Sequence, residues 1–308
     1  MSVVMETKAE RKKRASRMTT GDKVFNVFAI ALVSLLTLIV LIPLMNVVAS
    51  SFSNPKAVRD GRVWFWPVDP TFENYKAILN YSHVWLGYRN TIFYTVCGTL
   101  INVSMTLICA YPLSQKQFGG RKFFNLLFFF PLLFNAGMIP NYMLMRDIGF
   151  LNTVWAILVP GAISVYNMII TRTFIQTSIP ESIAEAAMLD GCSVFRYFFS
   201  FILPLSKTII AVIAMYYAVD HWNAYFNAFL YLNNSDLYPL QLFLREILIS
   251  SSFAAGAVDD PELMEQMKSL ANTLKYVVIV VATFPLMCIY PFVQKYFIKG
   301  VMIGSVKG

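Results

Sequence analysis

Polar residues inside long apolar runs are the first candidates for chemistry in this sequence. They carry carboxylate, amide, phenol and indole groups, at Asn141, Tyr166, Asn167, Asp220, Trp222 and Asn223. An ionisable group such as Asp220 costs about 2.5–3.5 kcal/mol to place at the centre of a bilayer, so it is a functional candidate by default. Such groups either contact a passing solute or lock neighbouring helices together, and the sequence leaves both interpretations open.

A second candidate is the stretch 180–204, which lies between two strongly apolar runs. Pro180 and Glu181 suit the first turn of a helix, where a missing N–H costs nothing and a carboxylate meets the positive end of the dipole. Asp190 and Gly191 suit its end, because glycine readily adopts the left-handed conformation that closes a helix. Ser193 can cap a second helix. We therefore predict a helix–turn–helix that forms a docking surface.

Catalytic and cofactor motifs are missing from the sequence. It has no GxxxxGK[ST] loop, so we expect it not to bind ATP through a phosphate loop. It lacks HExxH and GxSxG, and its two histidines, His83 and His221, are too few for a multi-histidine metal site. We expect a chain that holds no metal or cofactor of its own and is not an enzyme by itself.

The composition indicates a membrane protein. Of 308 residues, 57% are hydrophobic and only 14% are charged, with a mean hydropathy of +0.58. Soluble domains carry about 25% charged residues, so this chain has too few for a surface in water. The net charge of +8 is better explained by membrane topology than by nucleic-acid binding. The four scattered cysteines give no disulfide framework, and the first apolar run is too long for a cleavable signal peptide.

Six apolar runs approach or exceed the ~20 residues that a membrane span needs. They cover residues 24–50, 91–113, 123–145, 151–170, 205–232 and 274–293. The outer half of the third run is polar, which predicts a break there. The chain then divides into a basic tail (1–23), a first transmembrane helix (24–52), an extracytoplasmic segment (53–89), a core (90–298) and a second tail (299–308). A short amphipathic helix is predicted at 239–249.

Basic residues are distributed unevenly between the two predicted sides of the membrane. With six spans, both termini share one side, and that side holds 16 of the 25 Lys and Arg residues. Seven of these lie in the N-terminal tail. Basic residues favour the cytoplasm, so we predict that both termini and the stretch 180–204 are cytoplasmic.

The stretch 180–204 contains the sequence EAAMLDGCSVFRYFFSFILP. It resembles the EAA loop, EAAxxDGxxxxxxxxxIxLP, of permease subunits in binding-protein-dependent ABC importers. The matching positions are Glu185, Ala186, Ala187, Asp190, Gly191, Leu203 and Pro204. The sequence departs from the family at Phe201, where the pattern has Ile, and at Cys192, where Ala is common. FENYKAIL, HWN, YPLQLFLREIL and KGVMIGSVKG are similar to segments of the carbohydrate permeases, the last two to those for complex oligosaccharides of the lipoprotein-associated or aldouronate/alginate type.

This resemblance implies an all-α integral membrane protein with the six-helix, MetI-like fold of type I ABC importer permeases. It implies a bacterial cell-membrane location and four kinds of partner: a homologous second permease, two copies of a cytoplasmic ABC ATPase, an extracytoplasmic sugar-binding protein and membrane lipid. ATP and Mg²⁺ would be used by the ATPase. Glu185 would pair with a basic residue of the ATPase, Ala186 and Ala187 would allow close packing, and Gly191 would set the turn.

Two alternatives differ in function. A permease of the same fold could carry a non-sugar solute, such as an amino acid, a peptide or an ion, although the carbohydrate-like segments argue against it. A membrane enzyme or sensor would need a catalytic constellation that the sequence does not show. Within the apolar runs, Trp222 and Asn223 offer a sugar a ring to stack on and groups to hydrogen-bond, whereas a structural network would use the same side chains for packing.

Overall fold

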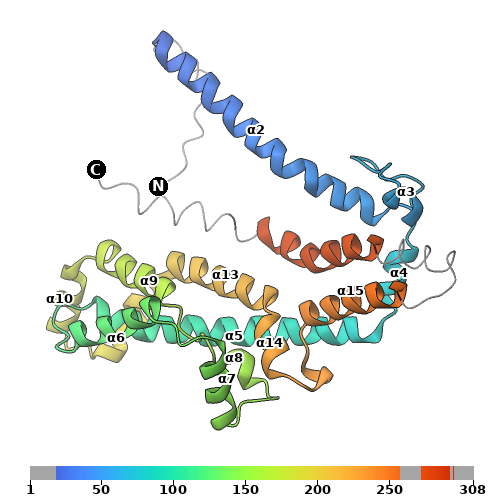
Figure 1. Ribbon diagram of the computed structural model, residues 1–308. Helices are drawn as coiled ribbons and strands as arrows, with labels where there is room; N and C mark the ends of the chain where they lie inside the picture. Colours follow the sequence, from blue (N-terminus) through green and yellow to red (C-terminus); the bar gives the residue numbers. More distant parts are fainter. Residues whose placement is uncertain (1–18, 257–271, 292–293, 295–308) are drawn as a thin grey trace.

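The computed structural model describes residues 19–256, 272–291 and 294, and over these residues it is helical with no strand (Figure 1). The N-terminal half comprises α2 (Thr20–Ser51), α3 (Pro55–Arg59), α4 (Glu73–Leu79), α5 (Ser82–Ser114), α6 (Arg121–Leu133) and α7 (Met138–Asp147). Then come α8 (Trp155–Leu158), α9 (Val165–Ser178), α10 (Glu181–Leu189), α11 (Val194–Tyr197), η1 (Phe198–Ile202), α12 (Leu203–Leu205), α13 (Lys207–Asn223), α14 (Phe226–Tyr231), η2 (Ser235–Leu237) and α15 (Leu240–Gly256). A further helix, Asn272–Pro291, follows.

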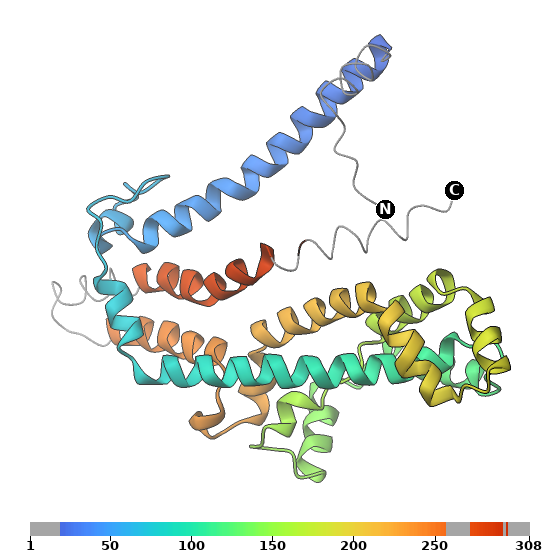
Figure 2. The same ribbon diagram turned by 180° about the vertical axis from the view of Figure 1, so that it is seen from behind.

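Helix α5 is the central helix of the bundle. Its 33 residues span about 50 Å at 1.5 Å per residue, and α9, α13 and α15 pack along it (Figures 1 and 2). Because these helices contact different parts of its length, α5 extends from one end of the bundle to the other. The 180–204 loop lies at its C-terminal end, α4 lies at its N-terminal end, and α15 runs along its N-terminal part toward that end.

Polar side chains on α5 hold the connection between α14 and α15. The Asn90 amide donates to the carbonyls of Asp236 and Tyr238 at 2.7 and 3.0 Å. Thr91 Oγ1 accepts from the backbone N–H of Leu240 at 2.8 Å. Both α5 side chains are buried, so these bonds satisfy groups that water does not reach.

A second buried polar contact joins α5 to α13. Tyr217 Oη accepts from the backbone N–H of Ser164 at 3.0 Å and shares a hydrogen bond of 2.6 Å with Thr106 Oγ1. The contact brings together two helices and the loop that precedes α9. In a membrane, where helices gain little from apolar packing alone, such bonds help to define their positions.

Helix α2 diverges from the bundle in both views. It is exposed along most of its length, and only its last three residues, 49–51, are buried. Thr19 and Asp22 form a capping box at its start. Its far end is attached to α4, where Ser51 Oγ and Tyr75 Oη are 2.8 Å apart and the Phe52 and Tyr75 rings stack.

Three helices in the described part of the chain are long and apolar enough to cross a membrane: Thr20–Ser51, Ser82–Ser114 and Asn272–Pro291. A fourth span is possible if Val194–Leu205 and Lys207–Asn223, which meet at 78°, are counted together. The first, second and sixth predicted spans thus correspond to single helices. The second helix begins nine residues before the predicted 91–113, inside the segment assigned to the extracytoplasmic side.

The third predicted run is interrupted, as expected from its polar half. It forms α6 and α7, separated by residues 134–137. Gly137 has φ +84°, a conformation that side chains disfavour, and its N–H donates to Asn135 Oδ1 at 2.9 Å. Local sequence therefore accounts for this break.

The fourth and fifth runs were predicted as continuous spans, and the structure corrects both. The fourth divides into α8 and α9 around Pro160 and Gly161, the latter with φ +76°. The fifth ends as a helix at Asn223, after which Ala224 is extended and α14 begins. Proline and glycine explain the fourth break. The fifth has neither, so tertiary contacts rather than a local signal place it. The predicted amphipathic helix 239–249 is present as the first part of α15.

Candidate coupling surface

The first helix of the 180–204 loop is closed by a pattern of backbone bonds. Helix α10 starts after Pro180 and ends at Asp190, and Gly191 follows with φ +72°. The N–H of Cys192 donates to Ala187 O at 2.9 Å, and that of Gly191 to Met188 O at 3.1 Å. This pair of bonds is a Schellman motif, which uses glycine at the left-handed position. The predicted turn is therefore confirmed.

The second helix begins where it was predicted. Ser193 caps α11, its Oγ accepting from the backbone N–H of Arg196 at 3.3 Å. A π-helical turn, η1, precedes Pro204, and the chain then bends by 78° into α13. Proline lacks the N–H that would bond to the preceding turn, and its ring crowds the carbonyl there. This effect accounts for the irregular helix at that point and for the fresh start of α13.

The two alanines of the EAA pattern face different surroundings. Ala187 is buried in one core with Ile175, Ile179 and Tyr197, whereas Ala186 is exposed. The small side chain of Ala187 thus lets α10 pack closely against the neighbouring helices of this chain. Burial raises the pKa of the Tyr197 phenol, and the neighbouring Cys192 raises it further.

The outward side combines acidic and apolar groups. Glu185 and Asp190 are exposed, and the large apolar side chains beside them are exposed as well, Leu189 by 89% and Phe195 by 79%. We call this set the coupling surface; it comprises Glu185, Ala186, Leu189, Asp190, Val194 and Phe195. It lies at one extreme of the molecule, at the label α10 in Figure 1. Exposed apolar groups around a carboxylate are typical of a protein-docking surface.

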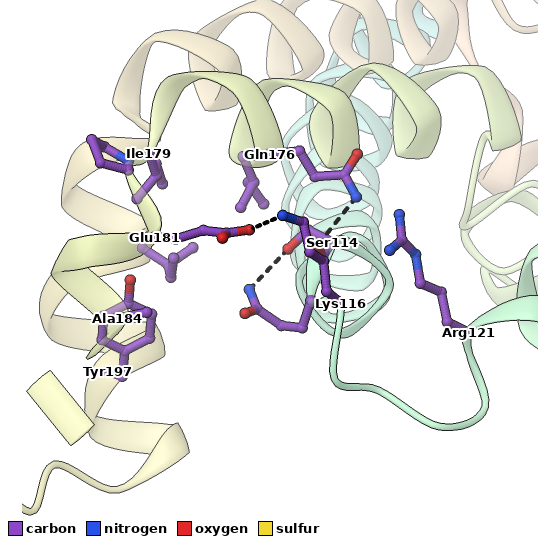
Figure 3. Close-up of a pocket in the computed structure, with 12 residues that line it drawn as sticks. Ser114, Lys116, Arg121, Gln176, Ile179, Glu181, Ala184 and Tyr197 are labelled. Atoms are coloured by element: carbon purple, nitrogen blue, oxygen red, sulfur yellow. Dashed lines mark hydrogen bonds and ion pairs between the residues drawn. The ribbon is translucent and has the colours of Figure 1, made fainter. Parts of the chain in front are cut away.

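The inner side of α10 is tied to the end of α5 across a pocket of about 290 Å³ (Figure 3). Lys116 Nζ lies 2.6 Å from Glu181 Oε1, joining the link after α5 to the first turn of α10. On α9, Gln176 donates to Ser114 O at 3.1 Å. The predictions did not include these contacts, since Lys116 was counted only as a basic residue of a cytoplasmic link.

The polar residues of the apolar runs divide into two groups. Trp222 and Asn167 are buried, and the Trp222 indole donates to Ala282 O at 3.0 Å. The others are exposed: Asn141, Tyr166, Asp220 and Asn223. Asn223 donates to Val219 O, one turn back on α13, at 2.9 Å. The six residues therefore differ in burial, with two inside the bundle and four on its surface.

Within the described ranges, no group of three or more His, Cys, Asp or Glu residues is placed to hold a metal ion. The four cysteines are free thiols. The arrangement offers a surface for docking at one end of a bundle of helices.

Comparison with known families assigns the fold. Residues 14–303 match the family described as "Binding-protein-dependent transport system inner membrane component". The chain belongs to this family. It is therefore a bacterial inner membrane protein and a transport subunit, an ABC importer permease rather than an enzyme. A binding-protein-dependent system also implies an ATPase and a substrate-binding protein as partners.

Two relatives from Bacillus subtilis (strain 168) match this permease over most of their length. It is 38% identical to the polygalacturonan/rhamnogalacturonan transport system permease protein YtcP, over 86% of this chain and 92% of the relative. It is 37% identical to protein LplC, over 94% and 97% of the two chains. A solved structure, a bacterial ABC transporter involved in the import of the acidic polysaccharide alginate, superposes with a TM-score of 0.79 at 32% identity. That match covers 91% of this permease and 99% of the other chain.

Proposed function

We propose that this permease imports oligosaccharides, and that an ATPase drives it through the coupling surface. The observation that carries the proposal is the EAA loop, whose Schellman turn presents Glu185 and Leu189 outward at one end of the bundle. The substrate class rests on the relatives, several of which are named for oligosaccharide or polysaccharide transport. Galacturonan and alginate are polymers of sugar acids, which favours an acidic oligosaccharide for this permease.

The proposed topology has six spans with both termini in the cytoplasm. The three broken runs, 123–145, 151–170 and 205–232, would each cross the membrane as shorter helices. Support comes from the ends of α5, which are about 50 Å apart and carry the EAA loop and α4 respectively. That separation exceeds the ~40–45 Å thickness of a bilayer with its headgroups, so the two regions fit on opposite sides.

The proposed assembly is a heterodimer of this permease with a homologous second one, on two copies of a cytoplasmic ATPase. ATP and Mg²⁺ would bind to the ATPases, and a binding protein outside would deliver the sugar. Movement of α10 would reach α5 through the packed core around Ala187, because the Lys116–Glu181 ion pair is exposed to solvent and contributes little. Glu185 would pair with a basic group of the ATPase.

The substrate path is proposed to use the exposed polar residues. Asp220 and Asn223 lie on the surface of α13, and Asn141 and Tyr166 lie on the surfaces of α7 and α9. Trp222 and Asn167 would support the path from within, because they are buried in this conformation. A second permease that covers α13 would enclose the exposed groups between the two subunits.

The substrate proposal is tested with the purified complex in proteoliposomes, with its binding protein and a panel of oligosaccharides. We expect acidic oligosaccharides to stimulate ATP hydrolysis and to be taken up, with neutral ones weaker. Stimulation by amino acids or peptides, with none by any sugar, would favour the alternative of a non-sugar importer.

The coupling role is tested by Glu185→Lys. Reversing this exposed charge should separate ATP hydrolysis from uptake while leaving the protein in the membrane, because the residue is not part of the bundle core. Glu181→Gln is the matched control: it lies one turn earlier on α10 and bonds to Lys116, within the same chain. We expect uptake to fall at least tenfold in the first variant, the loss of about 1.4 kcal/mol or more of coupling, and to change little in the second. Unchanged uptake with Lys at position 185 would exclude the coupling role.

A further inference from the structure

The segment after α2 folds back against the helix that it leaves. Ala49, Ala57 and Val63 form a small core there, all of them at least 93% buried. Ser53, also buried, donates to Ala49 O at 2.7 Å and accepts from the N–H of Val68 at 3.0 Å. The segment is thus a folded unit attached to the end of α2.

An asparagine inside the apolar helix fixes the position of this unit. The Asn46 amide donates to Val63 O at 2.9 Å and to Trp64 O at 3.2 Å. Both donors of the amide are used, which is a favourable way to place an asparagine near lipid. The bonds hold the backbone of residues 60–68, which we call the aromatic loop, alongside α2 about 7 Å before its end.

The aromatic loop directs its rings away from the protein. Trp64 is 68% exposed, Phe65 41% and Trp66 79%, whereas Val63 beside them is buried. An anchored backbone that displays two indole rings is unfavourable in water, because each ring keeps a large apolar area exposed. The same display is favourable at a membrane interface, where the ring lies in the headgroup region and the N–H meets water.

The distance of the aromatic loop from Lys23 along α2 agrees with a position at the membrane interface. Lys23 is the last charged residue before the apolar run of α2, and Asn46 follows 23 residues later. At 1.5 Å per residue, this places Asn46 about 35 Å from Lys23 along the helix. The hydrocarbon core is about 30 Å thick and the headgroup layers extend the bilayer to about 40–45 Å. If Lys23 marks one edge of the core, Asn46 and the aromatic loop lie in the opposite headgroup layer.

We propose that the aromatic loop is a lipid anchor that sets the height of α2 in the bilayer. Trp64 and Trp66 insert at the headgroup level of the leaflet opposite Lys23, and Asn46 holds them at that level. The anchor matters because α2 is exposed along nearly its whole length, so the bundle contributes little to its placement. This role is independent of which solute the permease carries.

The test uses the complex in nanodiscs made with brominated phospholipids, which quench nearby indole fluorescence. Comparing the wild type with Trp64→Phe/Trp66→Phe isolates the emission of the loop. We expect the double variant to lose the part of the lipid-quenched emission that the loop supplies, and bromine near the carbonyl end of the acyl chain to quench the loop more than bromine near the methyl end. Trp222→Phe is the matched control, since Trp222 is 95% buried in the bundle and its loss should leave the lipid-quenched emission unchanged.

A second variant separates the anchor from mere proximity to lipid. Asn46→Leu removes both bonds to the loop but keeps an apolar helix. We expect it to abolish the preference for shallow bromine. Quenching of the loop by iodide in the water, with no effect of brominated lipid, would overturn the proposal and show a surface free for a binding protein or a sugar. A depth preference unchanged by Asn46→Leu would overturn the role of Asn46.

Discussion

At the residue scale, one glycine determines how closely two helices approach. The ring of His221 on α13 lies against Gly98 of α5, where a Cβ atom would overlap the imidazole. Neither residue was linked to the other by the sequence, because 123 positions separate them. His221 is a polar residue inside an apolar run, and its ring packs against α5. Its role here is to pack α13 closely against α5.

This contact gives a prediction for Gly98→Ala. Overfilling a packed interior costs about 1–3 kcal/mol, so the variant should lower the thermal stability of the purified complex. His221→Ala in the same chain should restore part of the loss, because it removes the atoms that the new methyl group meets. The measurement is thermal denaturation of both single variants and the double variant. Additive losses in the double variant would contradict the contact.

At the element scale, the turn between α10 and α11 is the part most directly determined by local sequence. Proline before α10, glycine after it and serine before α11 all occur where the structure uses them. Each acts on neighbouring backbone groups, so its effect does not depend on the rest of the fold. The same reasoning found the break near Gly137 but missed two others. One lies at Pro160 and Gly161, which do mark it, and one follows Asn223, which no proline or glycine marks.

The turn yields a prediction for Gly191. With φ +72° and no atom within 4 Å of a built Cβ, a substitution there meets backbone strain and no clash. Gly191→Ala should cost about 1–2 kcal/mol, and Gly191→Asn less, because asparagine tolerates the left-handed region. Uptake by proteoliposomes, with ATP hydrolysis measured in parallel, should fall in the order Gly, Asn, Ala, Val. Equal uptake for Asn and Val would show that the turn conformation does not matter for coupling.

At the scale of the whole molecule, the single chain leaves polar and apolar surfaces exposed, and lipid or another subunit must cover them. Asp220 and Asn223 are exposed on α13, and α2 diverges from the bundle. Lipid can cover the apolar faces of α2, but hydrocarbon against a carboxylate is costly. A second subunit over α13, as proposed, would remove this cost and would enclose the proposed substrate path.

We therefore predict that the permease purifies from mild detergent with a homologous second permease and two ATPase subunits. Native mass spectrometry of the complex gives the stoichiometry directly. The physical reason is that α13 exposes polar side chains that a second subunit would cover, and that the coupling surface exposes apolar side chains that an ATPase would cover. A stable homodimer of this chain that hydrolyses ATP with its ATPases and imports sugar would contradict the heterodimer.

The sequence by itself determined the membrane class, the long single spans and the coupling turn, because these depend on composition, on runs of apolar residues and on caps within a few positions of one another. Only the tertiary structure decided which polar residues face outward. It buried Trp222 against Ala282, tied Glu181 to Lys116 and held the aromatic loop on Asn46. Each of these contacts joins residues 17 to 65 positions apart. Such pairs meet only once the helices have packed, so no local pattern specifies them.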